Sequence, residues 1–200
     1  MGKKSRKERA EKRESFAAKR SKQKRKSVLI AAGVLGVVAV IVGYSAYSFV
    51  TSTEAIPGAP PGAGALGDEH EHISLLVRIF GDKFDFSLPA YQIKSSWIHF
   101  EGSDGNTVHR HASGVTMGYL FGTLGLDVTN DCFIFQDGRE FCTNEDYSLK
   151  FYINRQPVEG NDFLSYVGHE EDRLLISYGN ETPEQIEEQL DELDSQAIIR

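Results

Sequence analysis

The sequence predicts an α+β protein in two parts, with one membrane-crossing helix followed by a folded domain outside the membrane. Three observations predict it: charges of opposite sign collect at the two ends, a long uncharged run follows the basic end, and strand-like runs fill the remainder. We therefore expect a basic tail at residues 1–27, a transmembrane helix at 28–50, a linker at 51–67, an α+β domain at 68–181 and an amphipathic C-terminal helix at 182–200.

The charge of the chain reverses along its length. The first 26 residues hold 13 of the 22 lysines and arginines but only three glutamates, so their net charge is +10. The rest carries nine basic and 26 acidic residues, which gives −17. Basic residues beside an apolar span mark its cytoplasmic end and attract anionic lipid headgroups. The acidic domain would repel nucleic acid, so we expect no nucleic-acid partner.

Residues 28–50, VLIAAGVLGVVAVIVGYSAYSFV, contain no charge. Crossing a bilayer takes about 20 apolar residues, so this segment is long enough. A cleaved signal peptide is the alternative, but its apolar core would have only roughly 7–15 residues. We therefore expect a single-pass anchor in the cell membrane, with lipid around residues 28–50, a cytoplasmic N-terminus and an extracytoplasmic C-terminal domain. The Pro/Gly/Ala-rich linker that follows is typical of a stalk.

The domain begins with a predicted hairpin and a predicted helix. Residues 73–80 and 83–87 are apolar or alternating runs on either side of Gly81-Asp82, a pair that favours a tight turn. Residues 114–125 place apolar side chains at helical spacing and end at Gly125, which can act as a C-terminal cap. We expect mostly antiparallel hairpins around this one helix.

The C-terminal part adds strands and a second helix. Residues 148–154 and 173–179 have strand composition. Residues 182–200 follow as an amphipathic helix, with Thr182 as the N-cap and Gln185 completing a capping box.

The two cysteines, Cys132 and Cys142, lie in a further predicted hairpin, CFIFQDGREFC. A three-residue loop ending at Gly138 places them directly opposite each other on the two strands. A cross-strand disulfide is then expected outside the membrane, where conditions are oxidising. A redox-active pair is the alternative, but dithiol oxidoreductases usually carry Cys-X-X-Cys at the start of a helix.

A hairpin at residues 97–112 carries three of the six histidines. A loop at Ser103-Asp104-Gly105, with Gly last, pairs His99 with His109. Because side chains alternate along a strand, one face should be polar. Its expected members are Trp97, His99, Glu101, Thr107, His109 and His111. The opposite face should enter the core, with Ile98, Phe100 and Val108.

Imidazoles that share a sheet face with a carboxylate can bind copper or zinc. We predict His99, His109 and His111 as ligands, joined by His70 or His72 if the first strand lies alongside. The alternative is that these are ordinary residues of a half-exposed strand. A register slip of one residue would separate His99 from the other two.

Two resemblances extend this interpretation. The segments YSLKFYINRQPV and YVGHEEDRLLISYG resemble small β-grasp domains, which implies a fold but no reaction. The whole layout, including PGAPPGAGALG, HEH, WIHFEGSDGNTVHRHASG and FQDGREFCTNEDYSLKFYIN, resembles a membrane-anchored protein family of ammonia-oxidising archaea. Some members of that family are labelled protein-disulfide isomerase. The dependence of such cells on copper favours copper over zinc.

Three functions follow as hypotheses. The first is a membrane-anchored extracytoplasmic binding module with a His-rich face for copper or zinc. The second is a metal-free domain that docks a membrane or extracytoplasmic protein, with Ile198 and Ile199 as contact candidates. The third is a thiol-disulfide oxidoreductase that uses Cys132 and Cys142. The sequence shows no nucleophile motif and leaves open whether any reaction is catalysed.

Overall fold

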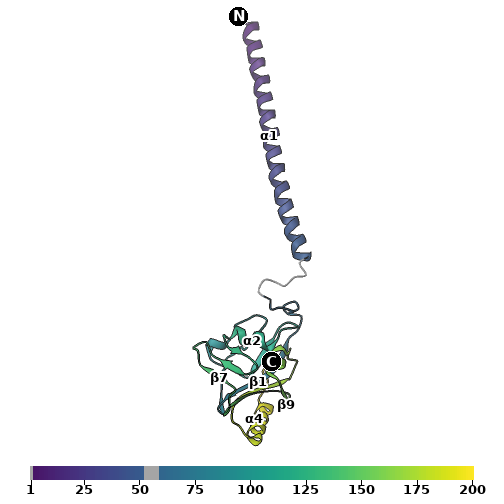
Figure 1. Ribbon diagram of the computed structural model, residues 1–200. Coiled ribbons are helices and arrows are strands. Elements are labelled where there is room, and N and C mark those ends of the chain that lie inside the picture. Colours follow the sequence, from purple (N-terminus) through teal and green to yellow (C-terminus); the bar gives the residue numbers. More distant parts are fainter. Residues whose placement is uncertain (1, 52–58) are drawn as a thin grey trace. The chain divides into compact units, whose positions relative to one another are not determined.

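The computed structural model describes residues 2–51 and 59–200, so residues 52–58 of the expected linker lie outside the described residues. The chain forms two compact units, Met1–Glu54 and Ala55–Arg200. In the first unit, helix α1 (Gly2–Thr51) contains both the basic tail and the apolar segment (Figure 1). The part from Lys19 to Ser48 is long and apolar enough to cross a membrane.

The second unit is an α+β domain, as the sequence predicts, and it is built on a mixed sheet of seven strands. Its strands are β1 (Glu71–Ile79), β2 (Asp82–Lys83), β3 (Ile98–His99), β4 (Thr107–Arg110), β8 (Ser148–Ile153), β9 (Gln156–Val158) and β10 (Arg173–Gly179). Their order is β3-β4-β1-β10-β8-β9, and β2 pairs with β1. The neighbours β1 and β10 are parallel, and all other pairs are antiparallel.

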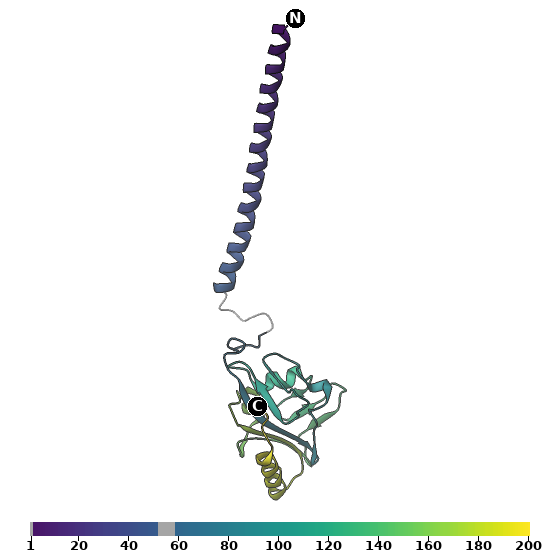
Figure 2. The same cartoon turned by 180° about the vertical axis from the view of Figure 1, so that it is seen from behind.

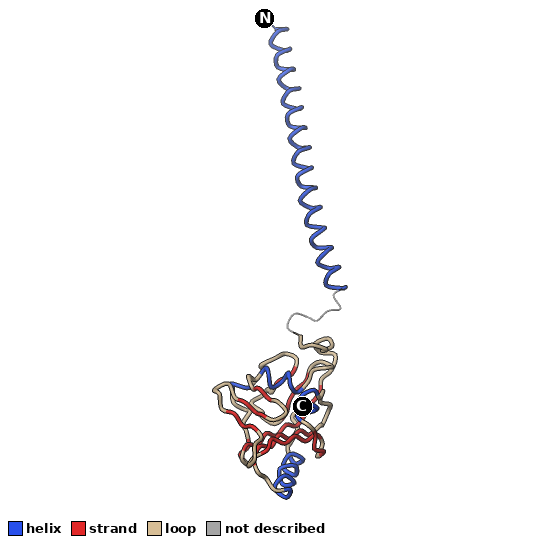
Figure 3. The backbone as a smooth tube through the Cα atoms, in the orientation of Figure 1, coloured by secondary structure: helices blue, strands red, loops and turns tan. Residues whose placement is uncertain are grey.

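A second, three-stranded sheet and three α-helices complete the domain (Figures 2 and 3). The small sheet consists of β5 (Asp127–Val128), β6 (Cys132–Ile134) and β7 (Glu140–Cys142). The helices are α2 (Met117–Thr123), α3 (Gly160–Ser165) and α4 (Pro183–Ser195), and a 3-10 turn lies at Pro89–Tyr91.

Apolar side chains form a separate cluster on each face of the large sheet. On one face, residues such as Ile73, Val108 and Leu174 pack with α2, α3 and the small sheet. On the other face, Leu76 and Leu175 pack beneath three apolar residues of α4: Ile186, Leu190 and Leu193. The domain therefore has a layer on each side of its large sheet, and α4 covers only part of the second face.

The C-terminal helix begins as predicted but is shorter than expected. Thr182 caps α4, and its side chain and that of Gln185 form both hydrogen bonds of the capping box. The helix ends at Ser195, so the last five residues are not helical and run back along the sheet. There the Ile199 N–H donates to the Thr107 hydroxyl at 3.0 Å, and the Ser74 hydroxyl donates to the Gln196 side-chain oxygen at 3.0 Å.

Two further expectations are corrected. The first turn lies at Phe80-Gly81, not at Gly81-Asp82, because Ile79 pairs with Asp82. Phe80 and Gly81 have φ of 53° and 82°, as a two-residue type I′ hairpin turn requires. The expectation of one central helix misses α3, which lies with β9 in the connection between β8 and β10. The resemblance to β-grasp domains stays a prediction.

Candidate metal centre

The sheet brings histidines from three strands into one row. His99 of β3 lies opposite His109 of β4, as the turn pattern predicts. His109 in turn lies opposite His72 of β1, because β1 pairs with the other edge of β4. Directly opposed residues have Cβ atoms about 5 Å apart, so the row is compact.

His70 and His111 complete the group at the ends of their strands. The backbone N–H of His111 donates to the Trp97 carbonyl at 2.8 Å, which continues the β3–β4 hairpin by one position. The five side chains, His70, His72, His99, His109 and His111, are called the histidine cluster below. The five imidazoles are arranged in a circle. The centroids of neighbouring imidazoles are separated by the following distances: His72–His70 4.7 Å, His70–His111 4.5 Å, His111–His99 4.9 Å, His99–His109 6.2 Å and His109–His72 4.9 Å.

The expected hairpin is correct in register but not in every detail. Ile98, Phe100 and Val108 face the core as predicted, but Trp97 also belongs to the core and not to the histidine face. The left-handed loop residues are Gly102 and Ser103, with φ of 65° and 58°, whereas Gly105 does not have positive φ. The Asp104 carboxylate instead organises the loop, because it accepts hydrogen bonds from the backbone N–H groups of Asn106 and Thr107.

Most of the histidine cluster is shielded from solvent. His72, His99 and His109 are 8%, 6% and 3% exposed, His111 is partly buried, and His70 is exposed. A histidine that is this well buried normally has hydrogen-bond partners for its ring nitrogens. The partners of each ring therefore bear on what the cluster can bind.

Two rings are oriented by acceptors outside the cluster. The Glu170 carboxylate accepts from the backbone N–H of His72 at 2.8 Å and lies 3.0 Å from its Nδ1. The Ser95 carbonyl lies 2.7 Å from Nδ1 of His99. Since a carbonyl or carboxylate oxygen can only accept, Nδ1 of each ring carries a hydrogen, and Nε2 of His72 presents a lone pair when that ring is neutral. A carboxylate behind a histidine is a common arrangement around bound metals.

Three buried nitrogens of the cluster have no hydrogen-bond partner among the described residues. They are Nε2 of His72, Nδ1 of His109 and Nε2 of His111. The nearest charged group to the His109 nitrogen is the Glu101 carboxylate, at 3.6 Å. Such atoms are rare in folded proteins and call for a ligand, an ion or water.

Two rings of the cluster, those of His109 and His111, favour the neutral form. Burial, followed by the neighbouring His99 and His70, lowers the pKa of His111 from 6.5 to about 4. Burial also lowers the pKa of His109, although the Glu101 charge opposes this effect. A hydrogen bond with His99 lowers the pKa of Glu101, which is therefore ionised. Neutral imidazole is the form that binds metal, so these rings need not lose a proton first.

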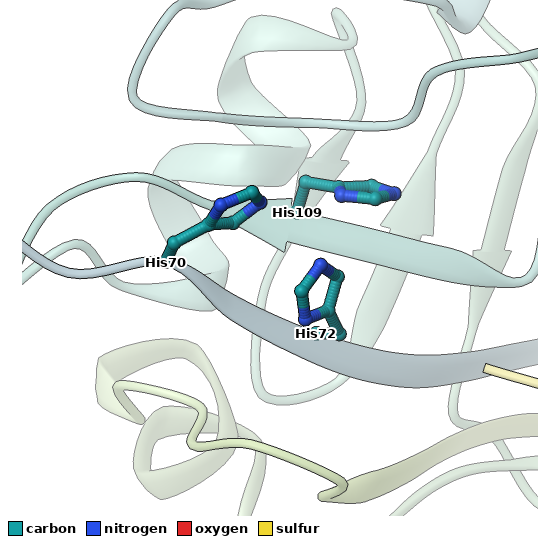
Figure 4. A group of neighbouring side chains, drawn as sticks. All are labelled: His70, His72 and His109. Atoms are coloured by element: carbon teal, nitrogen blue, oxygen red, sulfur yellow. The ribbon is translucent and has the colours of Figure 1, made fainter. Parts of the chain in front are cut away.

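The side chains of His70, His72 and His109 point toward one another from the segment before β1, from β1 and from β4 (Figure 4). Each offers a ligand nitrogen, and these nitrogens all lie within 4.8 Å of one another. In a tetrahedral zinc site with Zn–N bonds of about 2.0–2.1 Å, ligand nitrogens are about 3.4 Å apart. Small side-chain rotations would therefore bring the three rings onto one ion.

All five histidines proposed from the sequence thus come together, but two positioning residues are missed. Glu170 is 98 positions from His72 in the chain, and Ser95 contributes only its backbone carbonyl. Neither has a sequence pattern that links it to the histidines. The acidic run at 170–172 is visible in the sequence, but its contact with β1 depends on the turn before β10.

Cys132 and Cys142 lie directly opposite each other on β6 and β7, with Cα atoms 4.0 Å apart, and are joined by a disulfide. Gly138 has φ of 85°, as the predicted loop requires. The disulfide thus closes a hairpin of the small sheet and does not lie at the start of a helix.

Comparison of the chain with family models, with curated proteins and with solved structures finds no match.

Proposed function

We propose that the folded domain is a metal-binding module that holds a copper or zinc ion in the histidine cluster outside the membrane. The observation that carries this proposal is the set of three buried, unpartnered nitrogens on His72, His109 and His111. A bound cation would supply the partner that these nitrogens lack. His70, His72 and His109 form the innermost set of ligands.

The surroundings of the cluster support the same function. Glu170 fixes the ring of His72 from behind, which is how outer carboxylates orient metal-binding histidines. The net charge of −17 outside the basic tail draws cations toward the domain. A ring of nitrogen ligands suits both Cu²⁺ and Zn²⁺, and at a given nitrogen site Cu²⁺ binds more tightly.

The test uses the full chain in detergent micelles, freed of metal with a chelator and titrated with Zn²⁺ and Cu²⁺. The variant His72→Gln/His109→Gln should weaken binding of the tightest ion by at least about 100-fold, more than loss of an outer-shell partner. His169→Gln is the matched control, because the His169 side chain is 70% exposed and pairs with Asp172.

Equal affinities for the double variant and the unmodified chain would contradict the proposal, and so would failure of the unmodified chain to bind either ion. In either case the metal-free docking domain becomes the leading hypothesis. Crosslinking of the membrane-embedded protein would then test for a protein partner near Ile198 and Ile199.

A further inference from the structure

His70 differs in its burial from the other two members of the innermost ligand set. His72 and His109 are 8% and 3% exposed, whereas the side chain of His70 is exposed to solvent. The His70 ring approaches the other two from the segment before β1, outside the sheet (Figure 4). An ion held by the three rings would therefore be buried on the side of the strands and reachable from solvent on the side of His70.

The His70 ring is also the least constrained of the three, because neither burial nor a hydrogen bond holds it. The Glu170 carboxylate lies 2.8 Å from the backbone nitrogen of His72 and 3.0 Å from its Nδ1. The described residues form no such bond with the His70 ring, whose neighbours are the rings of His72 and His111. Exposed side chains change rotamer within picoseconds to nanoseconds. His70 is therefore the ligand that can leave and rejoin an ion most readily.

The backbone before His70, by contrast, is fixed. The Asp68 carboxylate accepts hydrogen bonds from the backbone N–H and the hydroxyl of Ser113, each at 2.8 Å. The Glu69 carboxylate forms an ion pair with Arg110, which is 1% exposed. Departure of the His70 ring from an ion thus needs side-chain rotation alone, and the anchored backbone allows the ring to return to the same position.

This arrangement differs from that of a structural metal site. Structural zinc ions are enclosed by four protein ligands, which leave no position for an incoming group. The innermost set of the histidine cluster instead has one exposed member beside two buried ones. A ligand from another molecule could therefore take the place of His70 while His72 and His109 still hold the ion.

We propose that the domain is a metal carrier, which exchanges its ion with a second protein through ligand exchange at His70. This inference rests on the proposed function and adds the route by which the ion enters and leaves. The partner presents exposed imidazole rings, because exchange between like ligands allows the ion to move in either direction.

Each step of the exchange forms one bond to the ion and breaks another. A nitrogen of the partner bonds to the ion and His70 leaves, and further partner nitrogens then replace the buried His72 and His109. One imidazole lone pair takes the place of another at every step. The ion therefore keeps its oxidation state, and neutral rings exchange without transfer of a proton.

Transfer kinetics test this inference. The full chain in detergent is loaded with one equivalent of Zn²⁺ and mixed rapidly with a chromophoric chelator that binds through aromatic nitrogens. The transfer rate should rise in proportion to the chelator concentration, because the chelator bonds to the ion on the His70 side before the buried ligands leave. A rate that does not depend on chelator concentration would overturn the inference, since the ion would then leave the protein before it meets an acceptor.

Two variants separate the exposed side of the ion from its buried side. His70→Gln replaces the exposed ligand with a weakly binding amide and should steepen the dependence of the rate on chelator concentration several-fold. Glu170→Ala removes the group behind His72 and should raise only the rate extrapolated to zero chelator, because it weakens a bond that the chelator does not reach. Equal effects of both variants on the concentration dependence would also overturn the inference. Circular dichroism checks that both variants remain folded.

The outcomes distinguish this inference from the proposed function. A chain that binds neither Zn²⁺ nor Cu²⁺ would contradict both. A chain that binds Zn²⁺ but transfers it at a rate independent of chelator concentration would leave the metal-binding function intact and overturn the carrier role. If His70→Gln binds too little Zn²⁺ to be loaded, the concentration dependence of the unmodified chain decides alone.

Discussion

On one face of the large sheet, Ile73, Leu75 and Val77 of β1 pack into the apolar core, whereas His72 and Leu76 alternate with them on the other face. Both faces are buried, but by different means. The first is covered continuously by α2, α3 and the small sheet. The second is covered by α4 over its apolar part and by the last five residues beside its polar part.

The two faces also differ in how their polar groups are satisfied. Arg110, which alternates onto the apolar face, is 1% exposed, and its Nε donates to the Gly168 carbonyl at 2.8 Å. Among the described residues, the buried side-chain atoms without hydrogen-bond partners belong instead to the second face or to the segments that cover it. Those residues are His72, Arg78, His109, His111, Ser177, Gln189 and Gln196. The apolar face is thus fully packed, whereas the other face retains buried polar atoms to which a ligand could bind.

The largest expected effect comes from breaking the apolar face. Phe121 of α2 is 1% exposed, and Phe121→Ala should lower the free energy of unfolding by about 3–5 kcal/mol because it leaves a cavity. Urea unfolding followed by fluorescence of Trp97, the only tryptophan, measures it. Phe16→Ala in α1 is the control, since Phe16 is 69% exposed. Equal shifts for both variants would refute the assignment of this core.

Removal of the disulfide should destabilise the small sheet that packs on the apolar face, and it should leave the histidine cluster on the other face unchanged. The double variant Cys132→Ser/Cys142→Ser should lose about 2–3 kcal/mol of stability because the unfolded chain gains freedom. Zinc affinity of the folded protein should stay within about twofold, since distant sites act independently. Parallel urea unfolding and zinc titration measure the two effects. A large loss of zinc affinity would show that the faces are coupled.

Acidification should act on the polar face. The pKa values of His111, about 4, and His109 are lowered in the folded state, whereas unfolded histidines titrate near 6.5. Between about pH 6.5 and 4 the unfolded chain binds more protons than the folded chain, so the free energy of unfolding falls as the pH falls. Above pH 6.5 the contribution of these histidines to stability is constant. Urea unfolding of the metal-free protein between pH 7.5 and 4.5 measures this change in the free energy of unfolding. His111→Gln should reduce the slope, and an unchanged slope would contradict the assignment.

The smallest expected effect concerns the C-terminal residues. Nε of Arg200 lies 3.2 Å from Oε1 of Glu170, the residue whose carboxylate orients His72. Arg200→Ala should weaken zinc binding by about tenfold, the lower end of the effects of outer-shell partners. Competition with a chromophoric chelator measures this change. Arg139→Ala, at the exposed turn between β6 and β7, is the matched control and should have no effect.

Local patterns in the sequence predicted several features correctly. The Gln136-Asp137-Gly138 loop placed Cys132 opposite Cys142, and the turn after Phe100 paired His99 with His109. The Thr182 and Gln185 capping box marked the start of α4. These features depend on residues within about ten positions of one another, so turn geometry and side-chain alternation are enough to specify them.

Other features were predicted only conditionally, as for His72, or not at all, because their causes lie far apart in the chain. His72 joins His109 only because β1 pairs with β4, and Glu170 reaches His72 only because β10 lies parallel to β1 on its other side. The return of the last five residues depends on how α4 packs on Leu76 and Leu175.

The sequence by itself thus determined the apolar segment, the α+β composition, the disulfide hairpin and three histidines on one hairpin face. Only the tertiary structure decided that five histidines and two carboxylates meet. The reason is that strand order and the choice of strand neighbours come from burial of whole faces, which no local pattern encodes.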